Sequence, residues 1–147
     1  MKFGRVEDPG SIDFTLPEDH PETSILLQNL QHPDNLTLDV GCAKWSRQEL
    51  KNFYPPEAKD DLAWYPSRFN AIELNATFYR YFSADQIVEW VEEVPPHFHF
   101  FPKVHQEISH RKWLANITTP VERFEKSITR FHQKLGTSFL QLRDNFA

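Results

Sequence analysis

Several features that would narrow the function are missing from this sequence. It has a single cysteine, Cys42, so neither an internal disulfide nor a multi-cysteine zinc site can form. A lone cysteine is more often a small buried apolar side chain than a nucleophile. No apolar stretch reaches the roughly 20 residues that span a bilayer, and the N-terminus continues into acidic sequence rather than a signal-peptide core. We therefore expect a cytoplasmic protein with no membrane partner.

Glycine is scarce as well, and no low-complexity tract or internal repeat is present. The chain has four glycines against eleven prolines, which indicates stiff connections rather than flexible linkers. Its 147 residues are 39% hydrophobic and 14% aromatic, enough to build a real core. We expect one folded domain, preceded by an irregular, proline-rich and acidic N-terminal extension over residues 1–34 that contains a short helical turn near 22–30.

The chain also lacks an excess of positive charge. Its net charge of −5 argues against binding nucleic acid through the surface as a whole. The distribution is uneven, however, because nine basic and four acidic residues fall in the loops that would follow the predicted strands, namely 41–59, 75–83, 103–118 and 143–147. Those loops carry +5, which leaves −10 for the other residues. This contrast favours an anionic ligand at the loop end.

What is present is a series of four short apolar runs that predict β-strands. These runs cover residues 36–40, 71–75, 98–103 and 138–142. Each carries a polar residue at or near its C-terminal end: Asp39, Glu73, Lys103 and Gln141. Helical segments separate the runs, and such alternation is typical of parallel βα units, in which ligands bind at the C-terminal ends of the strands. The sequence therefore predicts an α/β fold.

Helix signals lie between the runs. A helix over 59–69 should be shortened or kinked by Pro66. Ser83, with a glutamine three residues later, forms a capping box for a second helix. Thr119 is expected to cap a third helix, with Pro120 in its first position and Glu122 completing the box. The apolar residues that recur in these helices are expected to form the core.

The most informative stretch is 69–79, which places polar groups on one face of an apolar strand. Side chains alternate along a strand, so Glu73 and Asn75 share one face while Ile72 and Leu74 share the other. A carboxylate in such a place needs a partner or a use, because its desolvation is costly. This segment therefore marks the expected site.

Taken together, these runs resemble the YecE-like family, also called domain of unknown function 72. The matching pieces are Val40-Gly41-Cys42-Ala43-Lys44-Trp45, Phe53-Tyr54-Pro55, the whole of 69–79, Lys103 with Ile108-Ser109-His110, and Leu140-Gln141-Leu142 with Phe146. The resemblance implies a TIM-barrel-like (β/α) fold with a pocket at the C-terminal ends of the strands, and no established activity.

The chain differs from that family in two ways. Arg143 stands where the family usually has proline, which changes the expected shape of the fourth loop. Family members are longer, and a closed barrel typically has eight strands in about 250 residues. We therefore expect a barrel that is truncated after the fourth strand, with residues 35–147 as its first half. Such a half-barrel is expected to self-associate, because its sheet edge and inner face lack partners.

The predicted site gathers residues from neighbouring strand ends. Glu73 and Lys103 are the candidate catalytic pair, with Glu73 as general base or acid. Lys103 could be an anion clamp, which we favour, a proton donor or, if desolvated, a Schiff-base nucleophile. His110 is a further acid/base candidate. Asn75 and Gln141 would orient a ligand through their amides. Two aromatic side chains could stack on it: Trp45 and Tyr79.

Alternatives remain open at this stage. Glu73 and Lys103 could instead form a structural ion pair. No tight metal-ligand spacing appears, so no metal is assigned and any cofactor is unknown. The first functional interpretation is binding of a small anionic ligand, phosphorylated or sugar-like, with acid/base catalysis. The second is a non-catalytic or nuclease-like module that binds nucleic acid, since the aromatic side chains near the loops also suit base stacking.

Overall fold

The structure is a computed structural model that describes residues 8, 10, 13, 15, 18, 20–29 and 37–146. The chain divides into two compact units, Met1–Thr37 and Leu38–Ala147. In the first unit, helix α1 spans Pro21–Asn29, where the sequence predicts a helical turn over 22–30. Residue 30 and most of the predicted extension lie outside the described residues.

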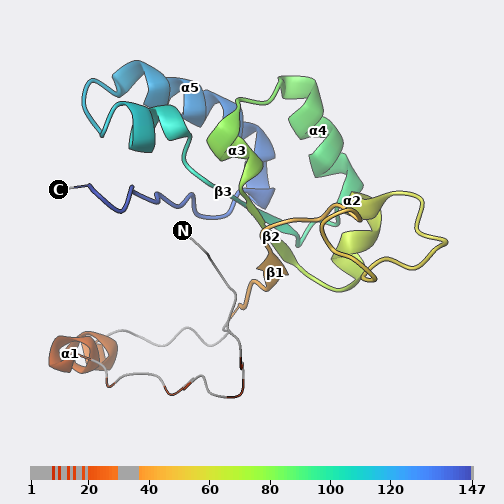
Figure 1. The fold of residues 1–147 in the computed structure, drawn as a ribbon, viewed down its shortest axis with the longest axis horizontal. Helices are drawn as coiled ribbons and strands as arrows, with labels where there is room; N and C mark the ends of the chain where they lie inside the picture. Colours follow the sequence, from red (N-terminus) through yellow and green to blue (C-terminus); the bar gives the residue numbers. More distant parts are fainter. Residues whose placement is uncertain are drawn as a thin grey trace. The chain divides into compact units, whose positions relative to one another are not determined.

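A parallel sheet forms the centre of the second unit (Figure 1). It consists of β1 at Gly41–Cys42, β2 at Ala71–Leu74 and β3 at His99–Pro102, in the order β1-β2-β3. Both pairings are parallel, with Cys42 beside Ile72 and Ile72 beside Phe100. The predicted α/β fold with parallel strands is confirmed for this part of the chain. The second and third strands lie where the sequence predicts them.

The first strand lies later than predicted. Residues 37–40 are irregular, residue 36 is outside the described residues, and pairing begins only at Gly41. The Asn70 side chain explains the shift, because its Oδ1 accepts from the Val40 N–H at 2.7 Å and its Nδ2 donates to Leu38 O at 2.7 Å. A side-chain amide therefore replaces the strand ladder here. Glycine is required at 41, since a Cβ there would lie 1.8 Å from the Ala71 carbonyl oxygen.

The predicted fourth strand is not a regular strand. In 138–142, the only bridge to the sheet pairs Phe139 with Lys103, while an earlier bridge pairs Leu135 with Phe100; both are parallel. The Val104 N–H donates to Phe139 O at 3.0 Å, and the Phe139 N–H donates to Pro102 O at 3.2 Å. Leu140, an apolar residue in the middle of this segment, is 46% exposed rather than packed in the core. One bridge does not fix the alternation of a whole strand.

The second unit also contains helices and shorter helical turns. Their bounds are Asp61–Trp64 for α2, Ala76–Tyr79 for α3, Ala84–Glu93 for α4 and Thr118–Ile128 for α5, with 3-10 turns at Tyr65–Ser67 and Thr129–Lys134 and a π-helical turn at Glu107–Arg111. None of the helices within the described residues is long and apolar enough to cross a membrane.

The helix boundaries test the predicted signals. α2 has four residues and passes into a 3-10 turn at Pro66, which confirms the predicted shortening. At α4, the Ser83 Oγ accepts from the Gln86 N–H at 3.2 Å, so half of the capping box forms. The predicted cap at Thr119 is wrong. The cap residue of α5 is Ile117, without a side-chain hydrogen bond, because the helix begins at Thr118 and takes Thr119 into its first turn.

The core lies against one face of the sheet. Ile72, Leu74, Phe98 and Phe100 are almost completely buried, as predicted from the alternation. Phe100 stacks on Phe131, with ring centroids 4.7 Å apart. The same cluster contains buried side chains from the helices: Leu62, Ile87, Trp90, Phe124 and Ile128. Burying these large apolar side chains, at roughly 25 cal/mol per Å² of apolar surface, stabilises the sheet and helices as one body.

Candidate functional site

A pocket of about 650 Å³ lies at the C-terminal ends of the strands. The loop after β1, the end of β2, the start of α3 and the residue after β3 form its walls. It is lined by Ala43, Lys44, Trp45, Ser46, Glu49, Glu73, Leu74, Asn75, Ala76, Tyr79 and Lys103. Five of the seven residues predicted for the site therefore line one pocket. The other two, Gln141 and His110, lie outside this lining.

Glu73 carries an exposed carboxylate at this pocket. Asn75 Nδ2 donates to Glu73 Oε1 at 2.8 Å, so the predicted carboxylate and amide contact each other directly. Asn75 can sit so close because the chain turns into α3 immediately after β2, and the Asn75 N–H donates to Glu73 O at 3.1 Å. This contact engages one of the two carboxylate oxygens of Glu73.

Lys103 lies at the end of β3 and is held by polar and aromatic groups. Its Nζ donates to Gln141 Oε1 at 2.5 Å and lies 4.7 Å from the Phe78 ring centroid. Within residues 37–146, no carboxylate lies within ion-pair distance of this ammonium. The ion pair considered between Glu73 and Lys103 does not form. Among these residues, Lys103 therefore has no ion-pair partner at the strand end.

Thr77 is a positioning residue that the sequence reasoning missed. This threonine is 4% exposed, and its hydroxyl lies 2.8 Å from Leu74 O and 2.7 Å from Lys103 O. It thereby joins the ends of β2 and β3, which carry the two charged groups of the pocket. A small hydroxyl residue two positions after Asn75 was the available signal, because such side chains often bond nearby backbone carbonyls.

His110 lies in the π-helical turn, beside the pocket rather than in it. Its Nδ1 is 2.8 Å from Ser109 Oγ, and its ring meets Phe78 edge-on with centroids 4.8 Å apart. Burial lowers the pKa of His110, and the charges of Arg143 and Lys103 lower it further. His110 therefore favours its neutral form. Lys103 and His110 both contact Phe78, so that ring links the histidine to the pocket.

The aromatic candidates differ in how firmly they are held. Trp45 meets Trp90 edge-on at 5.3 Å, and its carbonyl accepts from the Tyr54 hydroxyl. Burial raises the pKa of Tyr54 to about 12, so this phenol remains a donor. Tyr79 is 69% exposed and touches Phe78 edge-on at 5.0 Å. One aromatic wall is fixed and the other is free to cover a ligand.

A smaller hollow of about 270 Å³ lies further down the open face of the sheet, and Glu73 lines it together with Asp39. Asp39 Oδ1 is 2.8 Å from His99 Nδ1, so this carboxylate already has a partner. Among the described residues, no three His, Cys, Asp or Glu side chains are grouped so that they could hold a metal ion. The main pocket is thus lined by two lysines, two glutamates, one amide and two aromatic rings, and Gln141 contacts Lys103 from outside this lining.

Known proteins with related sequences and structures share this arrangement of strands and helices. A DUF72 family protein of Thermotoga maritima MSB8 superposes on this chain with a TM-score of 0.62 at 26% identity. The match covers 74% of this chain and 45% of that one. A DUF72 family protein of Enterococcus faecalis V583 superposes with a TM-score of 0.52 at 24% identity. This match covers 60% of this chain and 34% of that one. The chain thus spans less than half the length of either solved relative.

Neither relative carries a functional description. Both are described only as DUF72 family proteins, and no functionally curated protein matches the chain significantly. Residues 39–147 match the family described as "Protein of unknown function DUF72", a span that contains β1 to β3 and every residue of the pocket. The match covers most of the sequence and agrees with the YecE-like resemblance, so this chain belongs to the DUF72 family.

Proposed function

We propose that this protein binds a small anionic ligand, phosphorylated or sugar-like, in the pocket at the ends of β2 and β3. The observation that carries this proposal is the ammonium of Lys103, which has no carboxylate within ion-pair distance in the described residues although Glu73 lines the same pocket. An unpaired cation in a partly enclosed site attracts an anion, and a charge-assisted hydrogen bond to phosphate is stronger than a neutral one.

The rest of the pocket supports a ligand that is more than a bare anion. Its volume of about 650 Å³ exceeds what phosphate alone would fill. Trp45 and Tyr79 offer aromatic faces for a sugar ring and Asn75 offers an amide for hydroxyl groups, while Gln141 holds the Lys103 ammonium from outside the lining. Lys44 adds no free charge, because its Nζ lies 2.8 Å from Glu49 Oε1. Lys103 is therefore assigned as the anion contact.

Acid/base catalysis is the finer part of the proposal. Glu73 would act as general base or acid toward a hydroxyl or a carbon-bound proton of the ligand, with Lys103 stabilising developing negative charge. His110 would serve as a second acid/base group only for a ligand long enough to pass Phe78. Since burial and nearby cations lower its pKa, His110 would begin as a base at neutral pH.

The complete architecture is proposed on the same grounds. Residues 35–147 would form the first half of a TIM-barrel-like (β/α) domain after the extension at 1–34, because the strands are parallel and the solved relatives are more than twice as long as the matched region. The open face with half-buried Phe101 and Phe139 would pair with another copy. Light scattering on the 147-residue chain should detect an oligomer, and a purely monomeric sample would contradict this pairing.

One observation favours the second candidate function, a non-catalytic or nuclease-like module that binds nucleic acid. The Trp113 ring stacks on Phe146 at 6.0 Å and 18°, and the Arg143 guanidinium lies over Trp113 at 5.1 Å. Aromatic faces next to cations suit bases and phosphates of a single strand. The excess of acidic residues over the whole chain weakens this alternative relative to a small ligand.

Calorimetry with glucose 6-phosphate and inorganic phosphate tests the binding proposal, with glucose as the uncharged compound for comparison. Lys103→Met should weaken binding of both phosphate compounds about tenfold, the effect of losing roughly 1.4 kcal/mol of interaction. Lys126→Met, an exposed change in α5 away from the pocket, is the matched control and should bind like the unchanged protein. Equal affinities for the Lys103 and Lys126 variants, or no binding of either phosphate compound, would contradict the proposal.

Glu73→Gln separates catalysis from binding, because it keeps the size and the contact with Asn75 while removing the charge. In an enzyme, this variant should lose turnover of a phosphorylated sugar and keep its affinity. In a binding module, affinity should hold or rise, since repulsion of the anion falls. Turnover that survives Glu73→Gln would remove Glu73 from the catalytic role.

A further inference from the structure

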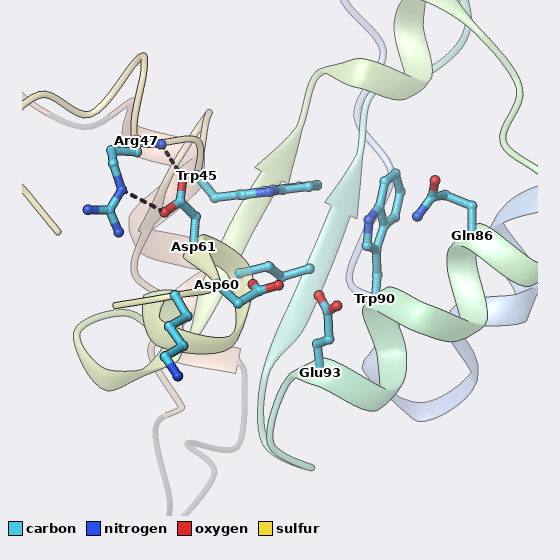
Figure 2. Close-up of a pocket in the computed structure, with 9 residues that line it drawn as sticks. Trp45, Arg47, Asp60, Asp61, Gln86, Trp90 and Glu93 are labelled. Carbon is cyan, nitrogen blue, oxygen red and sulfur yellow. Dashed lines mark hydrogen bonds and ion pairs between the residues drawn. The ribbon is translucent and has the colours of Figure 1, made fainter. Parts of the chain in front are cut away.

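A second pocket lies apart from the proposed anion site, between the start of α2 and the side of α4 (Figure 2). Its volume is about 530 Å³. It is lined by Trp45, Arg47, Lys59, Asp60, Asp61, Leu62, Gln86, Trp90 and Glu93. The proposed function uses only Trp45 of this lining, and none of the charged residues of this pocket takes part in it.

The one arginine in the lining is already committed to the protein. Arg47 Nε donates to Asp61 Oδ1 at 3.2 Å, and the Arg47 backbone N–H donates to Asp61 Oδ2 at 2.5 Å. Its two terminal nitrogens donate to the carbonyl oxygens of Pro55 and Ala58. Arg47 and Asp61 therefore cancel each other's charge and hold the loop in place, and neither is free for a ligand.

The ammonium of Lys59 and two carboxylates remain. Figure 2 shows Asp60, the residue that caps α2, and Glu93 of α4 reaching toward each other across the pocket. Within residues 37–146, neither lies within ion-pair distance of a basic group, Lys59 included. Burial raises the pKa of Glu93, and the charge of Asp60 raises it further. Two like charges that repel each other across a cavity are stabilised by a cation placed between them.

The aromatic walls decide which kind of cation fits. Trp45 and Trp90 meet edge-on, with ring centroids 5.3 Å apart at 76°, and both indoles border the pocket (Figure 2). Indole faces attract ammonium groups through the ring quadrupole and also cover alkyl carbons. Among the described residues, by contrast, no three His, Cys, Asp or Glu side chains are grouped so that they could hold a metal ion.

We propose that this pocket binds an organic ammonium ion, with its charge held between Asp60 and Glu93 and its alkyl carbons against Trp45 and Trp90. The proposal is independent of the anion site, because it uses other charged residues and the opposite charge. Trp45 borders both pockets, so it is not varied in the test.

The test is calorimetric titration of the 147-residue chain with 1,4-diaminobutane, with 1,4-butanediol as the neutral compound of the same length. The diamine should bind and the diol should not. Glu93→Gln should weaken diamine binding about tenfold or more, whereas Glu92→Gln, an exposed change on the same helix outside the pocket, should leave it unchanged. Lys103→Met should also leave it unchanged, which separates this proposal from the anion site.

A second variant removes the other carboxylate without removing the helix cap. The Asp60 Oδ1 accepts from the Ala63 N–H at 2.9 Å, and asparagine caps helices about as well as aspartate. Asp60→Asn should therefore keep the fold, checked by circular dichroism, and weaken diamine binding. Absence of diamine binding, equal binding of the diol, unchanged affinity in both variants, or displacement of the diamine by equimolar magnesium chloride would each overturn the proposal.

Discussion

The two faces of the parallel sheet have different roles, although the same strands form both. On the covered face, Ile72 and Phe100 have no exposed surface and pack with the helices. On the open face, Glu73 is exposed and Phe101 beside it is half-buried. Alternation along a strand separates the residues that stabilise the fold from those that are available for a ligand.

This separation has a consequence for the site. Because the covered face provides the hydrophobic core, the polar residues of the open face need not contribute to stability. Asn75 contacts Glu73 from two residues away and Gln141 contacts Lys103 from 38 residues away, and neither contact is a buried ion pair. Substitutions on the covered face should therefore change stability, whereas substitutions on the open face should change ligand binding.

The largest expected effect belongs to the covered face. Phe100→Ala should lower the free energy of unfolding by about 3–5 kcal/mol, because it removes a fully buried ring that stacks on Phe131. Phe101→Ala, the next residue on the opposite face, is the matched control and should cost less than half as much. Urea denaturation followed by circular dichroism measures both changes. Equal losses would show that the open face is also part of the core, and the comparison would fail.

A smaller expected effect concerns the pKa of His110, which depends on the cations near the main pocket. The pKa of His110 is lowered by burial first and then by Arg143 and Lys103. Removing a nearby cation favours the protonated imidazole, so Lys103→Met should raise the pKa of His110, while Lys126→Met should not. NMR titration of the histidine ring protons follows this directly. An unchanged pKa of His110 in Lys103→Met would show that the charge of Lys103 does not act on this histidine.

Alternation made the second and third strands predictable from the sequence. The pattern around Glu73 identified both the buried face and the polar face of β2, and Lys103 was correctly placed at the next strand end. The five predicted residues among those that line the main pocket come from these two segments and from the loop containing Trp45. Short-range periodicity was sufficient there, because each strand is paired along its length.

Other features depended on contacts that periodicity does not encode. The first strand begins late because Asn70, thirty residues further on, bonds Leu38 and Val40 through its side chain. The segment from Leu135 to Leu142 has an apolar pattern, but its only β-bridges are two isolated ones, Leu135 with Phe100 and Phe139 with Lys103. His110 was placed in the site, but the π-helical turn holds it behind Phe78. Each of these outcomes was decided by a tertiary contact.

The central claim is that the open strand end around Lys103 binds anions, and a residue-resolved NMR titration with glucose 6-phosphate tests it most directly. The account predicts saturable shift changes at the backbone amides of Glu73, Asn75 and Lys103, with Asp60 and Glu93 unaffected, and their loss in Lys103→Met. Saturable changes confined to other surfaces, or changes at the pocket that persist at full size in Lys103→Met, would contradict it.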